Sequence, residues 1–168
     1  MRFRGSTWFR RVVAGHYAPA VHLVPTPLWG VNLRAKLSAS SWKSLRARLL
    51  AERGLRCETC GAVEEARKIH AHEEWSYHAS QATAVARVTS VQLVCAKCHA
   101  VEHFGRLTLL AARGQLAASV LDDVIAHFCR VNDATPADFD DAEAAAVTTW
   151  RRLSAISEWR VEWGPFAG

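Results

Sequence analysis

Along the chain, hydrophobic residues recur either at every second position, as in strands, or at every third or fourth position, as in helices. The succession of these two patterns predicts the order of strands and helices. The apolar run at residues 21–29, VHLVPTPLW, predicts a short strand that ends at two prolines. The segment SSWKSLRARLLAERG then has a helical period, because Trp42, Leu45 and Leu49 fall on one stripe. Serines precede this stripe as caps, and Gly54 predicts the end of the helix.

The middle of the chain changes to the period of a strand. The stretch KIHAHEEWSY alternates, so that one face carries His70, His72 and Glu74. The opposite face carries the residues between and beside them, namely Ile69, Ala71, Glu73, Trp75 and Tyr77. A second β-rich run, RVTSVQLVC, follows after a polar stretch. The two runs together predict a pair of strands.

Helical periods return after the second β-rich run. The sequence CHAVEHFGR predicts a short helix that places His99 and His103 on one side and stops at Gly105. Two further helices are predicted at about residues 107–113 and 115–130.

The last third of the chain has a clear helix start. In TPAD, Thr135 can cap, Pro136 suits the first turn and Asp138 completes a capping-box pattern, so a helix is predicted from here to about Leu153. The closing EWRVEW alternates as a strand. Strands and helices in this order predict an α+β fold.

Composition and charge narrow the functional class. Half of the residues are hydrophobic, which suffices for a core, but no apolar run approaches the about 18–20 residues of a membrane span. The start of the chain also lacks the apolar stretch of a secretion signal, so we expect an intracellular, cytoplasmic protein with no membrane partner.

Positive charge is concentrated in the first third of the chain. Residues 1–56 hold 11 Lys and Arg residues against the single acid Glu52, whereas the whole chain has a net charge of +5. Such density is typical of surfaces that bind phosphate backbones, although a solvated basic face is the alternative. The arginines that we expect to contact phosphates are Arg46, Arg48 and Arg53 of the predicted helix and Arg2, Arg4, Arg10 and Arg11 of a basic arm.

Four of the five cysteines form two C-x-x-C pairs. The pairs are Cys57 with Cys60 and Cys95 with Cys98. In a reducing compartment this spacing indicates a structural zinc, because each tight turn directs two thiolates and nearby amides toward one ion. Buried or redox-active cysteines are the alternative. Cys129 has the setting of a helical core residue.

The histidines around the second cysteine pair form another pattern. His99 and His103 are spaced to chelate one ion from a helix, and His70 and His72 lie on the strand just upstream. Surface or core histidines are a more common cause of such spacing. A zinc that pins both segments would bring the histidines together, which favours a second metal site.

These motifs, RCETCG, HAHEEWSY and LVCAKCHAVEH, resemble the HNH endonucleases. The resemblance covers roughly residues 20–163, and the sequence is most similar to a compact group of bacterial and phage members of the family. It implies a ββα-metal, treble-clef-like core with a four-cysteine structural zinc, flanked by N-terminal and C-terminal helices. Two positions depart from the family pattern: Ala71 stands where an acid or histidine is usual, and Ser90 or Gln92 stands near the expected asparagine.

The resemblance implies a metal-dependent endonuclease that hydrolyses phosphodiester bonds in DNA, and it leaves two assignments open. In one, His72 is the general base and a divalent ion such as magnesium, manganese or zinc binds His99 and His103. In the other, His72 is a third ligand, and Glu73 or His70 accepts the proton. Arg106, beyond the last histidine, is expected to hold an adjacent phosphate or to be an ordinary solvated cation; DNA is bound mainly through its backbone.

The sequence divides into a basic arm (1–20), an N-terminal strand and basic helix (21–56), a zinc-braced core (57–106) and a helical extension that ends in a strand (107–168). We expect these parts to form one globular unit. A competing hypothesis is a noncatalytic zinc module that binds nucleic acid or protein on a degenerate HNH scaffold. The tryptophans with periodic settings are expected to pack in the core, namely Trp42, Trp75, Trp150, Trp159 and Trp163.

Overall fold

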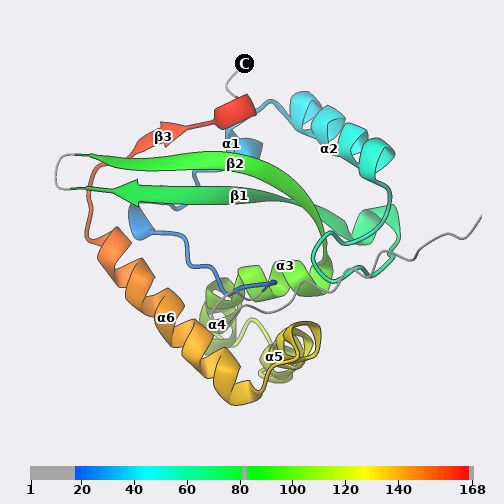
Figure 1. The fold of residues 1–168 in the computed structure, drawn as a ribbon, viewed down its shortest axis with the longest axis vertical. Coiled ribbons are helices and arrows are strands. Elements are labelled where there is room, and N and C mark those ends of the chain that lie inside the picture. The colour runs from blue at the N-terminus through cyan, green and yellow to red at the C-terminus, as the bar shows by residue number, and fades with distance from the viewer. Residues whose placement is uncertain (1–17, 81–82, 167–168) are drawn as a thin grey trace, which may run out of the picture.

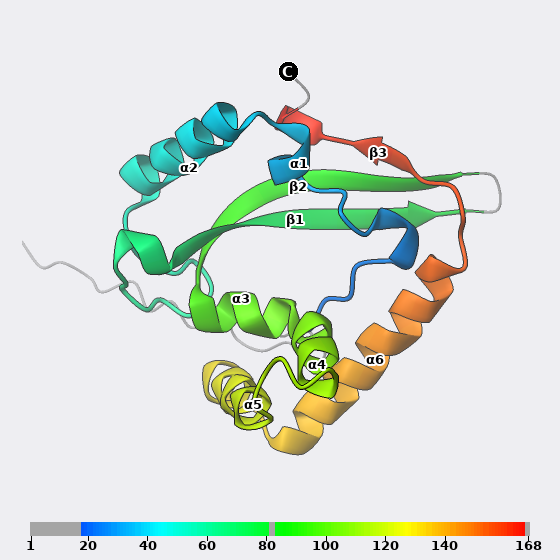
Figure 2. The same cartoon turned by 180° about the vertical axis from the view of Figure 1, so that it is seen from behind.

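The computed structural model describes residues 18–80 and 83–166 of the 168-residue chain. Within these ranges the protein has an α+β fold with a three-stranded sheet. A long β-hairpin crosses the molecule, with α3 to α6 on one side and α1, α2 and the C-terminal strand on the other (Figures 1 and 2). The predicted arm, with Arg2, Arg4, Arg10 and Arg11, lies outside the described residues.

The N-terminal segment does not form the predicted strand. Residues 21–25 have no regular secondary structure, and residues Thr26–Leu28 form the 3-10 helix η1. The amide of Leu28 donates to the carbonyl of Pro25 at 2.9 Å. The prediction of a strand over 21–29 is therefore wrong, because two prolines without amide protons favour a turn over pairing in a sheet.

Two helices follow this segment. Helix α1 spans Leu33–Lys36 and α2 spans Ala39–Arg53, so the predicted serine-capped helix is confirmed. Ser38 is its cap and accepts a hydrogen bond from the amide of Ser41 at 3.1 Å. Gly54 ends it with a φ of 77°.

The two predicted strands form an antiparallel hairpin. Strand β1 spans Ile69–Ala79 and β2 spans Ala84–Cys95, and Ile69 pairs with Cys95 at the base. A β-bulge shifts the register after Glu74. The alternation of EWRVEW predicted a closing strand, and the short strand β3 (Arg160–Glu162) is present. It pairs with β2 in parallel.

The helices after the hairpin start and stop differently from the prediction. Helix α3 spans Ala96–Glu102 and α4 begins directly after it, at Phe104–Ala112. Gly105 therefore lies inside α4 and is not a helix stop. It serves close packing instead, because a Cβ at this position would collide with the side chain of Leu23.

The last two helices complete the fold. Helix α5 spans Ser119–Asn132, and α6 spans Pro136–Ser154. The capping box of Thr135 and Asp138 is present as predicted, with both reciprocal hydrogen bonds. None of the described helices is both long and apolar enough to cross a bilayer.

Two hydrophobic cores and the cysteine cluster hold the elements together. The first core lies between one sheet face and the helices α1 and α2, around Leu33, Leu45 and Leu93. The second joins α3 to α6 around Phe128 and Phe139. The predicted core tryptophans are all only half-buried, and Trp42, Trp75 and Trp163 pack against the first core.

The position of Gly164, just after β3, allows a prediction about stability. Gly164 has a φ of 56°, and a Cβ added there would collide with the carbonyl oxygen of Val88. We expect Gly164→Ala to destabilise the protein by more than the about 1–2 kcal/mol of a left-handed alanine, measured by chemical unfolding. Gly114→Ala is the control, because Gly114 has a φ of 68° but open space around its Cα. Equal losses in the two variants would contradict the close contact between the C-terminal segment and β2.

Candidate functional site

Four cysteines from two parts of the chain form the first cluster. Cys57 and Cys60 lie in the turn after α2, whereas Cys95 ends β2 and Cys98 lies in α3. All four sulfur atoms lie within 4.8 Å of one another. The Sγ atoms of Cys60 and Cys95 are 3.8 Å apart, far beyond the about 2.05 Å of a disulfide bond. The cluster could therefore hold a metal ion, and four sulfur donors suit a tetrahedral one.

Each cysteine pair has the local geometry of a ligand turn. The amide of Cys60 donates to Sγ of Cys57 at 3.5 Å, and the amide of Cys98 donates to Sγ of Cys95 at 3.4 Å. Such hydrogen bonds stabilise thiolates. Both pairs are thus folded locally as the C-x-x-C spacing predicts.

The ionisation of the four thiols is strongly coupled. A hydrogen bond from Cys60 lowers the pKa of Cys57 to about 6, and hydrogen bonds from Cys57 and its neighbours lower the pKa of Cys95. The pKa values of Cys60 and Cys98 are raised, because their thiols are hydrogen-bonded to neighbouring cysteines, above all to Cys57. Only a cation among the sulfurs would allow all four to be thiolates at neutral pH.

Helix α5 supplies a hydrogen bond to the cysteine cluster. The buried His127 places Nε2 3.2 Å from Sγ of Cys98, and Arg130 approaches Nδ1 of the same ring at 2.9 Å. A guanidinium can only donate, so Nδ1 accepts and the proton resides on Nε2. His127 therefore donates to the sulfur of Cys98, which ties α5 to the cluster.

Three histidines form a second cluster beside the first. His72 lies on β1, His99 on α3 and His103 at the end of α3. One ring nitrogen from each lies within 4.8 Å of the others, so these residues could also hold a metal ion. The ring centroid of His72 lies 5.3 Å from that of His99 and 5.0 Å from that of His103. The two segments that the sequence predicted to meet therefore do meet.

Two further side chains border the three histidines. The ring of His70 stacks on that of His99, with centroids 4.6 Å apart. The buried Glu102 places Oε2 2.7 Å from Nε2 of His72, but not in hydrogen-bond geometry. Among the described residues this oxygen has no hydrogen-bond donor. A buried carboxylate oxygen without a donor beside three imidazoles fits a site that binds a cation.

The surroundings keep two of these imidazoles neutral. Burial is the largest cause that lowers the pKa of His99 to about 3 and that of His103 to about 4, and the neighbouring histidines contribute to both shifts. Neutral imidazoles have free lone pairs at neutral pH. The electrostatics of the cluster therefore suit metal binding.

Glu73 does not join the histidine cluster. Its carboxylate accepts hydrogen bonds from the amide of Leu33 at 2.8 Å and from Nε1 of Trp75 at 3.1 Å. Burial raises its pKa. The alternation of β1 thus turns Glu73 toward α1, on the opposite sheet face from His72.

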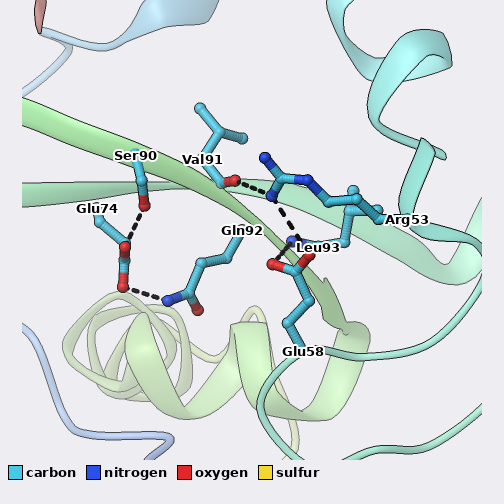
Figure 3. A network of polar contacts seen from close by, with 7 residues as sticks. All are labelled: Arg53, Glu58, Glu74, Ser90, Val91, Gln92 and Leu93. Atoms are coloured by element: carbon cyan, nitrogen blue, oxygen red, sulfur yellow. Dashed lines mark hydrogen bonds and ion pairs between the residues drawn. The ribbon is translucent and has the colours of Figure 1, made fainter.

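Glu74 lies on the histidine face of β1 and forms a small polar network with β2. Its carboxylate accepts hydrogen bonds from Ser90 and Gln92 (Figure 3). These two residues stand near the position where the resemblance leads us to expect an asparagine. In the same view Glu58 accepts from the amide of Leu93 at 3.1 Å, which fastens the first cysteine turn to β2.

The predicted phosphate-binding arginines have different surroundings. Arg46 donates to the carbonyls of Ala66 and Ile69, and Arg53 donates to the carbonyl of Val91, so both stabilise the fold. Arg48 is exposed and lies 3.9 Å from Glu52. Arg106 is exposed and lines the same cavity as the three histidines.

The sequence did not predict two side chains that the fold adds to the site. Glu102 lies between His99 and His103 in the sequence. Its place in the largely apolar stretch AVEHF could have indicated that its carboxylate is buried beside the histidines. His22 comes from the N-terminal segment and lines the same cavity. Reduced solvation lowers its pKa, while the charge of Glu102 raises it. No local signal indicates His22, because its position depends on the path of residues 18–28.

No family model, curated protein or solved structure matches this chain. The geometry of the two clusters is therefore the basis for the assignment of function.

The cysteine cluster predicts a metal-dependent fold. Cys98→Ser should remove one tightly bound metal ion per chain and abolish cooperative unfolding, because the binding energy of such a site is folding energy. Elemental analysis and thermal melting measure the two effects. Cys129→Ser is the control, since Cys129 lies outside the cluster. An unchanged melting curve in Cys98→Ser would rule out a structural role for the metal.

Because His127 of α5 donates a hydrogen bond to Cys98, we expect the native protein to lose its metal more slowly than variants without this contact. His127→Ala should weaken metal retention about 10- to 100-fold, measured as the rate of release to a colorimetric chelator. His127→Gln should restore part of the retention, because a glutamine amide can donate to Cys98 from a similar position. Identical release rates in all three proteins would show that the contact has no effect on the metal.

Proposed function

We propose that this protein is a divalent-metal-dependent nuclease that hydrolyses phosphodiester bonds in DNA. The observation that supports it most is the convergence of His72, His99 and His103, with ligand nitrogens within 4.8 Å. Three imidazoles on a hairpin and the following helix would leave further positions on an ion open to a phosphate and water.

We further propose that the hairpin β1–β2 and helix α3 form an HNH-like ββα-metal core. Its support is the order of the elements, a hairpin followed directly by a short helix, with four cysteines at its base. The metal that we assign to the four cysteines is zinc, because thiolates in tetrahedral sets are its preferred structural ligands.

The contacts favour His72 as a metal ligand rather than as the general base. Its ring is packed edge-on against both His99 and His103, and one ring nitrogen from each of the three lies within 4.8 Å of the others. Of magnesium, manganese and zinc, three imidazoles suit zinc best, since magnesium prefers oxygen donors.

A divalent ion at this position would neutralise charge on the scissile phosphate and lower the pKa of a water molecule. We assign the acceptance of a proton to His70, because it lies on the same strand face as His72 and lines the cavity. Glu73 is a poorer candidate, since its carboxylate is held by Leu33 and Trp75. Arg106 is placed to hold a phosphate next to the scissile one.

The first test is cleavage of DNA. Supercoiled plasmid should be nicked with zinc, manganese or magnesium, and His103→Ala should abolish nicking and remove a second, weaker metal ion. His78→Ala is the control, because His78 is an exposed histidine of β1 that lies outside both clusters. If the wild-type protein binds DNA but cleaves no form with any metal, the noncatalytic zinc module is the better description.

The second test separates the two proposed proton acceptors. His70→Gln should lower the cleavage rate by about 10²- to 10⁴-fold with metal content and melting unchanged. Glu73→Gln should instead lower the melting temperature, because the amide is a weaker acceptor for Leu33 and Trp75. A large rate loss in Glu73→Gln without a change in stability would reverse the assignment.

A further inference from the structure

Trp29 is a large aromatic side chain that is held in place but left open to solvent. It follows η1, and 58% of its surface is exposed. Its indole Nε1 donates to the carbonyl of Val24 at 2.9 Å, and its amide donates to the carbonyl of Thr26 at 3.2 Å. An exposed indole with fixed orientation is a low-entropy platform for a flat ligand.

Trp29 lines the same cavity as the three histidines. The cavity has a volume of about 1820 Å³, well above the about 300–1,000 Å³ of a small-molecule pocket. Leu109, 48% exposed, lines it as well. A space of this size beside exposed apolar side chains suits a segment of a polymer with flat apolar groups.

The charges of the cavity are arranged on different elements. Arg34 of α1 and Arg106 of α4 line it, together with Arg46 and Arg67, which donate hydrogen bonds within the protein. Helix α6 contributes Asp141 and Glu143. Glu74 also lines it, but its carboxylate is bonded to β2. A duplex has phosphates on both strands, so one backbone would meet the acids of α6. A single strand can turn its phosphates to the arginines alone.

We propose that this cavity binds a single-stranded segment of nucleic acid, with an unpaired base stacked on Trp29 and phosphates at Arg34 and Arg106. This rests on the proposed function, whose substrate class it specifies. Stacking on an aromatic ring tolerates any base, so the preference is for an unpaired strand rather than for a sequence. The three histidines of the same cavity would then act on that strand.

The experiment measures binding without cleavage. Fluorescence anisotropy with a labelled single-stranded oligonucleotide, in buffer without added divalent metal, gives the affinity, and an unlabelled duplex of the same sequence gives the competition. We expect the wild-type protein to prefer the single strand, and Trp29→Ala to weaken its binding about tenfold. Trp29→Phe should restore part of the affinity. Leu55→Ala is the control, because Leu55 is 40% exposed and lies outside the cavity.

Charge is tested in the same assay. Arg34→Gln should reduce the dependence of log affinity on log salt by about 0.7, the value for one phosphate contact on a single strand. Preference for the duplex, or equal affinities of wild type and Trp29→Ala, would overturn the proposal even if plasmid is cleaved. Tenfold weaker single-strand binding by Trp29→Ala would support it even if no metal gives cleavage, so the two proposals fail separately.

Discussion

Four sulfur atoms within 4.8 Å of one another set the main constraint on this structure. Cys60 and Cys95 are 35 positions apart in the chain, and their thiols cannot all ionise side by side without a cation. Bringing them together fixes the turn after α2 against the point where β2 becomes α3. Because the same point is the base of the hairpin, the direction of α3 relative to β1 follows from the cluster.

Helix α3 connects the cysteine cluster to the histidine cluster. Its first turn contributes Cys98, and the next residue, His99, already faces β1. Helix α3 ends at Glu102, and the backbone leaves the helical conformation at His103 before α4 begins at Phe104. One short helix thus holds both sets of donors, so a disturbance of the cysteine turns would also displace the imidazoles.

The N-terminal segment lines the cavity and is anchored to the last two helices. Asn132 of α5 accepts from the amide of Ala18 at 2.8 Å, and Ser154 of α6 accepts from the amide of Thr26 at 3.0 Å. Gly105 leaves room for Leu23 between these anchors. The path between them brings His22 to the histidine cluster and leads to Trp29 at the cavity, so the last two helices shape the site through this segment.

The sequence by itself determined the features that depend on near neighbours. The alternation of β1, the capping box at Thr135, and the two cysteine turns were all predicted, because each is formed within a few residues. The alternation also separated His72 from Glu73 correctly, since neighbouring residues of a strand point to opposite faces.

Only the tertiary structure decided the features that need distant partners. The strand expected over 21–29 is replaced by a segment anchored to Ser154, 128 positions away. Gly105 is a packing position rather than a helix stop because Leu23 lies against it. Arg46 and Arg53 donate hydrogen bonds to carbonyls of neighbouring elements, which their helical period does not reveal. Local periods encode which face a side chain occupies, but the group it meets there depends on how separate segments pack.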